Sequence, residues 1–169
     1  MTSLSVWHYP TPFGADAAEV RLKRLEEVGD ITVHDLVTVV WPSADKRPKI
    51  GHRRGRKKDL LGGTAMGVLI GTVLGGPVVG AAVGVAAGEV RHQTRGPVID
   101  EQVVAGLREE IRPGTSAMFV LSSGANVPAV REVLSRDRDA RLLHHESDSP
   151  VAQALLDELH AEQEKQDGA

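Results

Sequence analysis

Short apolar runs along the chain predict four β-strands, because alternating or continuous runs of β-branched and aliphatic residues are typical of strands. The clearest are residues 36–41, a β-branched run closed by Pro42, and residues 117–121, a nearly continuous apolar run typical of a central strand. The four predicted strands are residues 3–9, 31–41, 116–122 and 140–145.

Apolar residues three or four positions apart predict the helices that separate and follow these strands. Asn126 and the Ser149-Pro150 pair are start signals, since Asn and Ser cap helix N-termini and proline suits the first helical position. The predicted helices are residues 16–28, residues 99–111, and the segments after Asn126 and after Ser149. With residues 60–111 set aside, the order is strand, helix, strand, strand, helix, strand. This order predicts an α+β fold, a ferredoxin-like βαββαβ sandwich with a C-terminal helix.

Residues 60–88 interrupt this order with twenty-nine positions that carry no charge. Glycine recurs there at every fourth position in two consecutive series. Residues four apart share one face of a helix, so each series forms a smooth stripe against which another backbone can pack. With Pro77 at the junction, the pattern predicts a glycine-zipper helical hairpin inserted between the second and third strands. The residues predicted to pack in an oligomer or a membrane are Gly63, Gly67, Gly71, Gly75, Gly76, Pro77, Gly80, Gly84 and Gly88.

Glycine is a costly residue inside a helix, which makes external packing necessary for this hairpin. Each glycine lowers helix stability by about 1 kcal/mol relative to alanine, so eight of them lower it by roughly 8 kcal/mol. The partner arm, other copies of the chain or lipid-embedded helices must offset that loss. A flexible linker is the alternative, but linkers are rich in polar residues, whereas this segment is rich in Leu, Ile and Val.

A strongly basic segment lies immediately before the hairpin and is predicted to be a polar loop. It holds eight of the twenty Lys and Arg residues of the chain. Two interpretations stay open, a solvated loop of like charges or a segment that binds the phosphates of anionic lipid. Nucleic acid is a weaker expectation, because the segment contains no aromatic residue to stack on bases. The candidate phosphate contacts are Lys46, Arg47, Lys49, Arg53, Arg54, Arg56, Lys57 and Lys58.

Length and composition favour one ordinary domain. The chain has 169 residues, a formal net charge of −3 and no cysteine, which excludes disulfides and thiolate chemistry. The N-terminus lacks the basic and apolar regions of a secretory signal, so we expect a cytoplasmic protein or one at the cytoplasmic face of the inner membrane. The predicted parts are two halves of the ferredoxin-like domain (1–44 and 91–162), a basic loop (45–59), the hairpin (60–90) and a disordered tail (163–169).

Candidate chemistry is sparse. The only local histidine cluster is His144-His145-Glu146, and adjacent strand residues point to opposite faces of a sheet, so the two imidazoles are poorly placed to bind one ion. The glycine series has neither the Lys-Ser/Thr end of a phosphate loop nor a preceding strand typical of a dinucleotide fingerprint. We therefore predict no catalytic residues, no cofactor and no metal, and a protein that is not an enzyme.

Three segments together resemble a known family, DUF1269, whose members are uncharacterised bacterial proteins often labelled as membrane proteins. They are residues 35–40, the double glycine series from Gly63 to Gly88, and the run Ile-Arg-Pro-Gly-Thr-Ser-Ala-Met-Phe-Val-Leu at 111–121. The resemblance covers about residues 15–159. It implies the architecture above and association with a membrane. It carries over no catalytic residues, because the family has no established reaction.

The length of the apolar stretch bears on how it could meet a membrane. As one helix it would span about 43 Å, more than the roughly 30 Å of hydrocarbon, whereas each arm of a hairpin would be only about 20 to 24 Å long. The first hypothesis is a non-enzymatic protein that self-assembles and associates with the membrane through the hairpin and the basic segment. The alternative is a soluble cytoplasmic homo-oligomer whose zipper hairpins form its internal core, with a ligand-binding or stress-related role.

Overall fold

The computed structural model describes residues 1–45, 47–53, 66–67, 69–74, 100–137 and 139–167. Its strands are β1 (Thr2–Tyr9), β2 (Thr32–Val40), β3 (Lys49–His52), β4 (Ser116–Ser123) and β5 (Arg141–Ser147). Its helices are α1 (Gly14–Glu27), α3 (Glu101–Glu110), α4 (Val127–Leu134) and α5 (Pro150–Asp167). Residues 66–67 and 69–74 are also helical, and they are called the 66–74 segment below.

The strands form one antiparallel sheet, so the chain has the predicted α+β class. The strand order is β3-β2-β4-β1-β5, and every neighbouring pair is antiparallel. Strand β4 lies in the middle, where Phe119 is opposite Val6 of β1 and Val37 of β2. This central place explains the continuous apolar run at 117–121, because a strand with helices on both of its faces has no solvent side.

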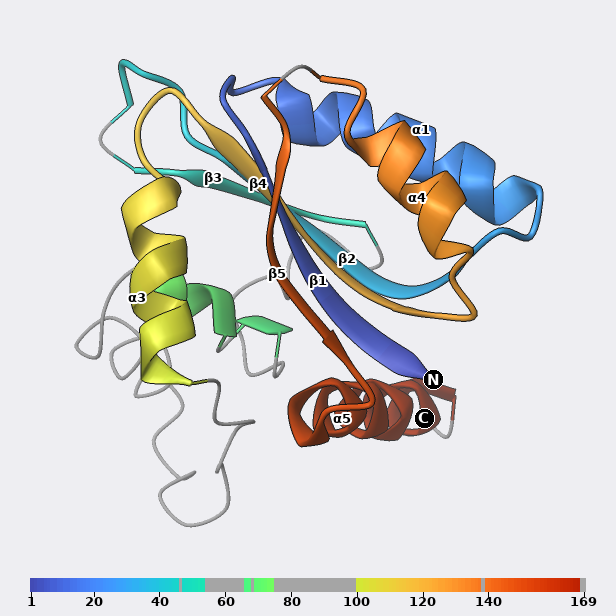
Figure 1. Cartoon of the computed structure of the whole chain (residues 1–169). Coiled ribbons are helices and arrows are strands. Elements are labelled where there is room, and N and C mark those ends of the chain that lie inside the picture. The colour runs from blue at the N-terminus through green and yellow to red at the C-terminus, as the bar shows by residue number, and fades with distance from the viewer. Residues whose placement is uncertain (46, 54–65, 68, 75–99, 138, 168–169) are drawn as a thin grey trace, which may run out of the picture.

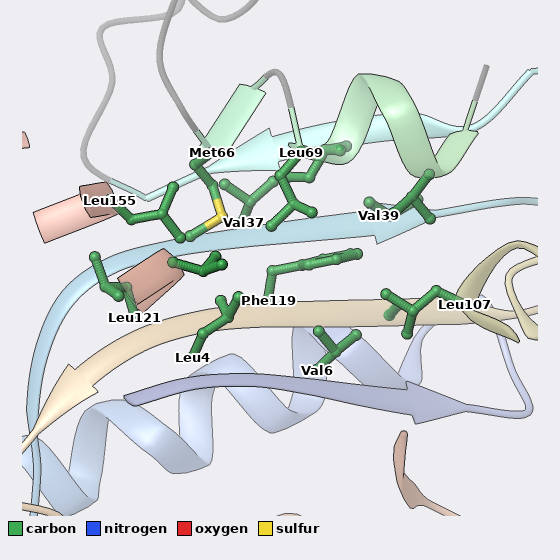
Figure 2. Packing of buried hydrophobic residues seen from close by; sticks show 14 of the residues in the cluster. Leu4, Val6, Val37, Val39, Met66, Leu69, Leu107, Phe119, Leu121 and Leu155 are labelled. Atoms are coloured by element: carbon green, nitrogen blue, oxygen red, sulfur yellow. The ribbon is translucent and has the colours of Figure 1, made fainter. Parts of the chain in front are cut away.

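Helices cover both faces of the sheet (Figure 1). Alternate residues of a strand point to opposite faces, and β1 follows this rule with Leu4 and Val6 on one side and Trp7 and Tyr9 on the other, since they belong to different buried clusters. The α1/α4 face carries Trp7, Tyr9 and Met118 together with buried residues of α1 and α4. The α3/α5 face carries Leu4, Val6 and Phe119 together with residues of α3, α5 and the 66–74 segment, as Figure 2 shows.

Two of the predicted helix starts are confirmed by their hydrogen bonds. The Asn126 side chain accepts a hydrogen bond from the backbone N–H of Ala129, and the Ser149 hydroxyl accepts one from the N–H of Ala152 over 3.0 Å. Each bond satisfies one of the N–H groups that a helix leaves unpaired at its start.

The prediction of an irregular basic loop is wrong at Lys49–His52, because these residues form β3 and pair with β2. The pairing places Gly51 opposite Thr38, and a Cβ atom on Gly51 would lie 2.6 Å from the Thr38 hydroxyl oxygen. A larger residue at position 51 would therefore require the Thr38 side chain to shift. The exposed Lys49 suits an edge strand, which is open to solvent along one side.

The prediction of a disordered tail is wrong for residues 163–167, because helix α5 continues to Asp167. The residues concerned are mostly Gln, Glu and Lys, which are good helix formers even without an apolar face. A polar composition therefore does not by itself end this helix.

Candidate functional site

The described part of the predicted zipper is the 66–74 segment, and it is built into the core. Met66, Leu69, Ile70 and Val73 recur at helical spacing and are all buried in the cluster on the α3/α5 face. Figure 2 shows Met66 and Leu69 lying over Val37, Val39 and Phe119 of the sheet. The apolar side of this first arm therefore packs inside its own domain.

The glycine side of the same segment is less enclosed. Gly67 and Gly71 are both only half-buried, although the residues on either side of the stripe include fully buried ones. A Cβ atom built on Gly71 would meet no atom within 4 Å. The close backbone approach that the zipper pattern predicts at Gly71 is thus not made within the described part of the chain.

The other predicted packing residues cannot be placed, because they lie outside the described residues. These are Gly63, Gly75, Gly76, Pro77, Gly80, Gly84 and Gly88.

Arg108 of α3 fixes the C-terminal end of the 66–74 segment. Its guanidinium donates hydrogen bonds from Nε to the Val73 carbonyl oxygen over 3.1 Å and from a terminal nitrogen to the Thr72 carbonyl oxygen over 2.7 Å. Hydrogen bonds from a charged guanidinium to carbonyl oxygens are strong, so this contact ties α3 to the 66–74 segment. A helical pattern assigns Arg108 only to a polar face, which is why sequence reasoning missed this role.

Two of the predicted phosphate contacts already have carboxylate partners. Arg53 forms an ion pair with Glu26 of α1 at 2.6 Å, with both side chains largely buried, and Lys49 pairs with Asp45 at 3.1 Å in an exposed position. Arg47 is exposed. The remaining basic residues, Lys46, Arg54, Arg56, Lys57 and Lys58, lie outside the described residues.

A buried acid–base pair holds β3 against β2. The Asp35 carboxylate lies 2.6 Å from Nε2 of His52, and its side chain is almost fully buried. The same carboxylate oxygen accepts a hydrogen bond from the backbone N–H of Leu36. Removing one partner of such a pair leaves a buried polar group uncompensated, so the contact ties the basic segment to the sheet.

Comparison with known proteins supplies the family. The sequence model of a family described as "Protein of unknown function (DUF1269)" matches residues 60–160, which is more than half of the chain. The chain belongs to the DUF1269 family. No curated protein and no solved structure matches it.

The DUF1269 match begins at residue 60, so β1, α1, β2 and β3 precede the matched span. Those elements are nevertheless part of the same sheet, since β4 pairs with β1 on one side and with β2 on the other. The matched residues alone therefore lack both strands that pair with the central strand β4. The 66–74 segment and α3, which Arg108 joins, both lie inside the DUF1269 span.

The histidines of this DUF1269 chain do not form a metal site in the part that the structure describes. His144 and His145 lie on opposite faces of β5, as predicted, since His144 lines a groove against α3 and His145 lines a cavity against α4. His144 is 3.6 Å from the Glu146 carboxylate. His8 is a buried residue of β1, and its burial lowers the pKa of its imidazole below the ordinary 6.5.

No helix within the described ranges has the length and apolar character needed to cross a membrane.

Proposed function

We propose that this DUF1269 protein is a non-enzymatic protein that self-assembles and associates with a membrane surface through residues 60–90. The observation that carries the proposal is the orientation of the 66–74 segment. Its apolar side is anchored in the core by Ile70 and Val73, whereas a Cβ atom on Gly71 would touch nothing within 4 Å. An open glycine position such as Gly71 is suited to close packing with another helix.

The proposed architecture is a ferredoxin-like sandwich that carries a glycine-zipper hairpin. Its support is the order of the four predicted strands: β4 lies between β2 and β1, β1 lies between β4 and β5, and neighbours are antiparallel. This is the arrangement of two interleaved βαβ units. The hairpin, residues 60–90, would include the 66–74 segment and extend beyond the Arg108 contact.

The basic segment is the proposed contact with anionic lipid. Arg47 precedes the edge strand β3 and Lys49 begins it; both residues are exposed, and the side chain of Lys49 remains 72% exposed despite its pair with Asp45. Each Lys or Arg near an anionic surface contributes about 1 kcal/mol to binding. Arg53 is the exception, because its pair with Glu26 is largely buried and occupies its guanidinium.

The test measures mass and membrane binding in parallel. Light scattering on the intact protein in detergent-free buffer gives its assembly state, and flotation with liposomes of anionic or neutral lipid gives its membrane binding. The proposal expects a multimer that floats with anionic liposomes only. A monodisperse monomer that ignores both kinds of liposome would contradict the proposal as a whole.

Charge variants separate the basic segment from general electrostatics. Replacing Arg47 and Lys49 together with Gln should weaken flotation with anionic liposomes. The matched control replaces Lys23 and Arg24, two exposed residues of α1, which removes the same charge from another surface. Equal effects from both pairs would show that flotation follows net charge and not the basic segment.

The second candidate is a soluble cytoplasmic homo-oligomer in which zipper hairpins from several copies form the internal core. The burial of Met66 and Leu69 in the domain favours it, because the first arm has less apolar surface left for lipid than its sequence suggests. A discrete multimer that does not float with any liposome would select this candidate.

A further inference from the structure

Strand β5 forms one edge of the sheet, and no strand in the part of the chain that the structure describes pairs with its outer side (Figure 1). The opposite edge, β3, has only four residues and begins with the exposed Lys49, and a short strand with a lysine discourages pairing with another sheet. Strand β5 has seven residues and contains neither lysine nor proline. Its outer side therefore presents a row of backbone N–H and C=O groups with which another strand can pair.

A β-bulge in β5 changes the usual alternation of its side chains. His144 and Leu142 are opposite consecutive residues of β1, so Leu143 is an additional residue in this strand. Leu143 and His144 both line the groove against α3. Leu142 and His145, on either side of them, both line the cavity against α4. Two successive residues therefore lie on the same face of the sheet, where a regular strand would place them on opposite faces.

Because of the bulge, the order of faces along β5 is the same in both directions. Arg141 forms an ion pair with Glu110 of α3 and so belongs to the α3/α5 face. Glu146 belongs to the same face, because its carboxylate lies 3.6 Å from Nε2 of His144. From residue 141 to residue 146 the faces are thus α3/α5, α1/α4, α3/α5, α3/α5, α1/α4 and α3/α5. This order is symmetric about the midpoint between Leu143 and His144.

This symmetry defines one register in which two copies of β5 can pair antiparallel. A two-fold axis through the midpoint places Leu142 of one copy opposite His145 of the other, and every other pair likewise shares a face, as a continuous sheet requires. A shift of one residue would place residues of opposite faces together. The same register places Arg141 opposite Glu146 of the second copy. These side chains are 56% and 40% exposed, and opposite charges across an antiparallel pair stabilise it.

We infer that β5 pairs with β5 of a second copy of this chain, antiparallel and about this two-fold axis, so that two five-stranded sheets become one. A bulge bends and twists a strand, so a regular strand fits this edge poorly, whereas a second copy carries the same bulge at the axis. The contact uses the same surface of each copy and closes on itself, so it produces a dimer. It involves neither residues 60–90 nor a membrane, so the dimer is independent of the proposed function.

Charge reversal tests the pairing of Arg141 with Glu146. Light scattering over a dilution series, on the full-length Gly71→Leu chain in which contact through the glycine series is blocked, should show a dimer. Glu146→Arg in this chain places like charges together at two points and should raise the dimer dissociation constant about ten-fold. Arg141→Glu should do the same. An equal mixture of the two variants should restore the dimer, because each copy then meets the opposite charge.

A disulfide between two copies tests the register directly. The chain has no cysteine, so introduced thiols are the only ones present. The Leu142→Cys and His145→Cys variants of the otherwise unchanged chain, mixed and mildly oxidised, should form a linked dimer that contains one chain of each. Residues directly opposite each other have Cβ atoms about 4.5–5.5 Å apart. Either variant alone should link far more slowly, because the same position in the two copies lies three residues apart along the strands, about 10 Å.

Glu132→Arg and Arg136→Glu are the matched controls for charge reversal, because these residues form an exposed pair of their own outside β5, at 3.7 Å. Both should leave the dimer dissociation constant unchanged, and losses equal to those at β5 would overturn the charge pairing. Absence of the mixed disulfide would overturn the register. A multimer that Gly71→Leu converts into a monomer would overturn the β5 dimer and leave the zipper of the proposed function standing. A dimer that persists in Gly71→Leu while no variant changes the mass at the zipper would have the opposite meaning.

Discussion

Arg108 donates from Nε to the carbonyl oxygen of Val73, thirty-five residues earlier in the chain, and this bond joins α3 to the end of the 66–74 segment. The same guanidinium donates a second hydrogen bond to the Thr72 carbonyl oxygen, and lysine cannot reproduce this bidentate contact. Both bonds are charge-assisted, because the guanidinium is a cation.

Replacement of Arg108 therefore tests whether this contact secures the segment. Arg108→Met keeps the aliphatic stem and removes both hydrogen bonds, so the free energy of unfolding should fall by about 1–3 kcal/mol. Arg108→Lys should recover part of the loss. Urea denaturation followed by circular dichroism measures both. Arg136→Met is the control, because an exposed pair contributes less than about 1 kcal/mol; a loss no larger for Arg108→Met than for this control would contradict the assigned role.

Ile70 tests whether the first zipper arm belongs to the folding unit. Its side chain is 2% exposed within the cluster on the α3/α5 face. Truncation of a buried isoleucine leaves a cavity and costs roughly 2–5 kcal/mol, so Ile70→Ala should lower the urea midpoint of the whole domain in a single transition. Val127→Ala, at a residue that is 50% exposed, should change the free energy of unfolding by less than about 0.5 kcal/mol. An unchanged midpoint for Ile70→Ala would mean that the segment does not pack on the sheet.

The elements that sequence reasoning found are those with a regular pattern of their own. Strand β2 was predicted from its β-branched run and α4 from its cap at Asn126, since each depends on local residues. Strand β3 was missed because Ile50 is the only apolar residue in Lys49–His52, and the strand exists through its partner β2. Local composition cannot indicate a pairing that a neighbouring strand imposes.

The candidate site likewise has features that the sequence shows and contacts that only the structure shows. The glycine repeat was visible in the sequence, and so was the buried stripe from Met66 to Val73, which has ordinary helical spacing. The sequence did not reveal that this stripe packs on the domain's own sheet. Arg108 and Asp35 also acquire their contacts from residues far away in sequence or across the sheet. Tertiary contacts of this kind leave no periodic signal.

His8 should make stability depend on pH. Burial lowers the pKa of its imidazole below 6.5, an effect that Arg141 and Arg112 reinforce and Glu110 opposes. The unfolded chain therefore binds this proton more readily than the folded chain, so the His8 contribution is complete above about pH 6.5 and is lost as the pH falls through the lower folded pKa.

The measurement is the free energy of unfolding in urea at several pH values between 5 and 8. The slope between pH 5 and 6.5 should become smaller in His8→Gln than in the unchanged protein, even though the substitution also lowers stability overall. His160→Gln, at an exposed position of α5, serves as the control for loss of a histidine. An unchanged slope in His8→Gln would assign the pH dependence to other groups.

Substitutions at Gly71 test whether glycine is required there for the stability of the domain or for self-association. If glycine served only the domain, Gly71→Ala would raise stability by up to about 1 kcal/mol, because alanine favours a helix and a Cβ there meets no atom within 4 Å. Gly71→Leu should leave the domain folded but block the close approach of another helix, so the mass measured by light scattering should fall.

The control for the Gly71→Leu variant is Gly106→Leu on α3. A Cβ atom at Gly106 likewise meets no atom within 4 Å, and this glycine is exposed at the groove beside β5. The two substitutions add the same side chain at two open positions, but only Gly71 belongs to the four-residue glycine series. Loss of mass in Gly71→Leu alone would support packing through the zipper face. Retention of the full mass in Gly71→Leu would mean that copies meet elsewhere, because a leucine side chain cannot fit where two helix backbones touch.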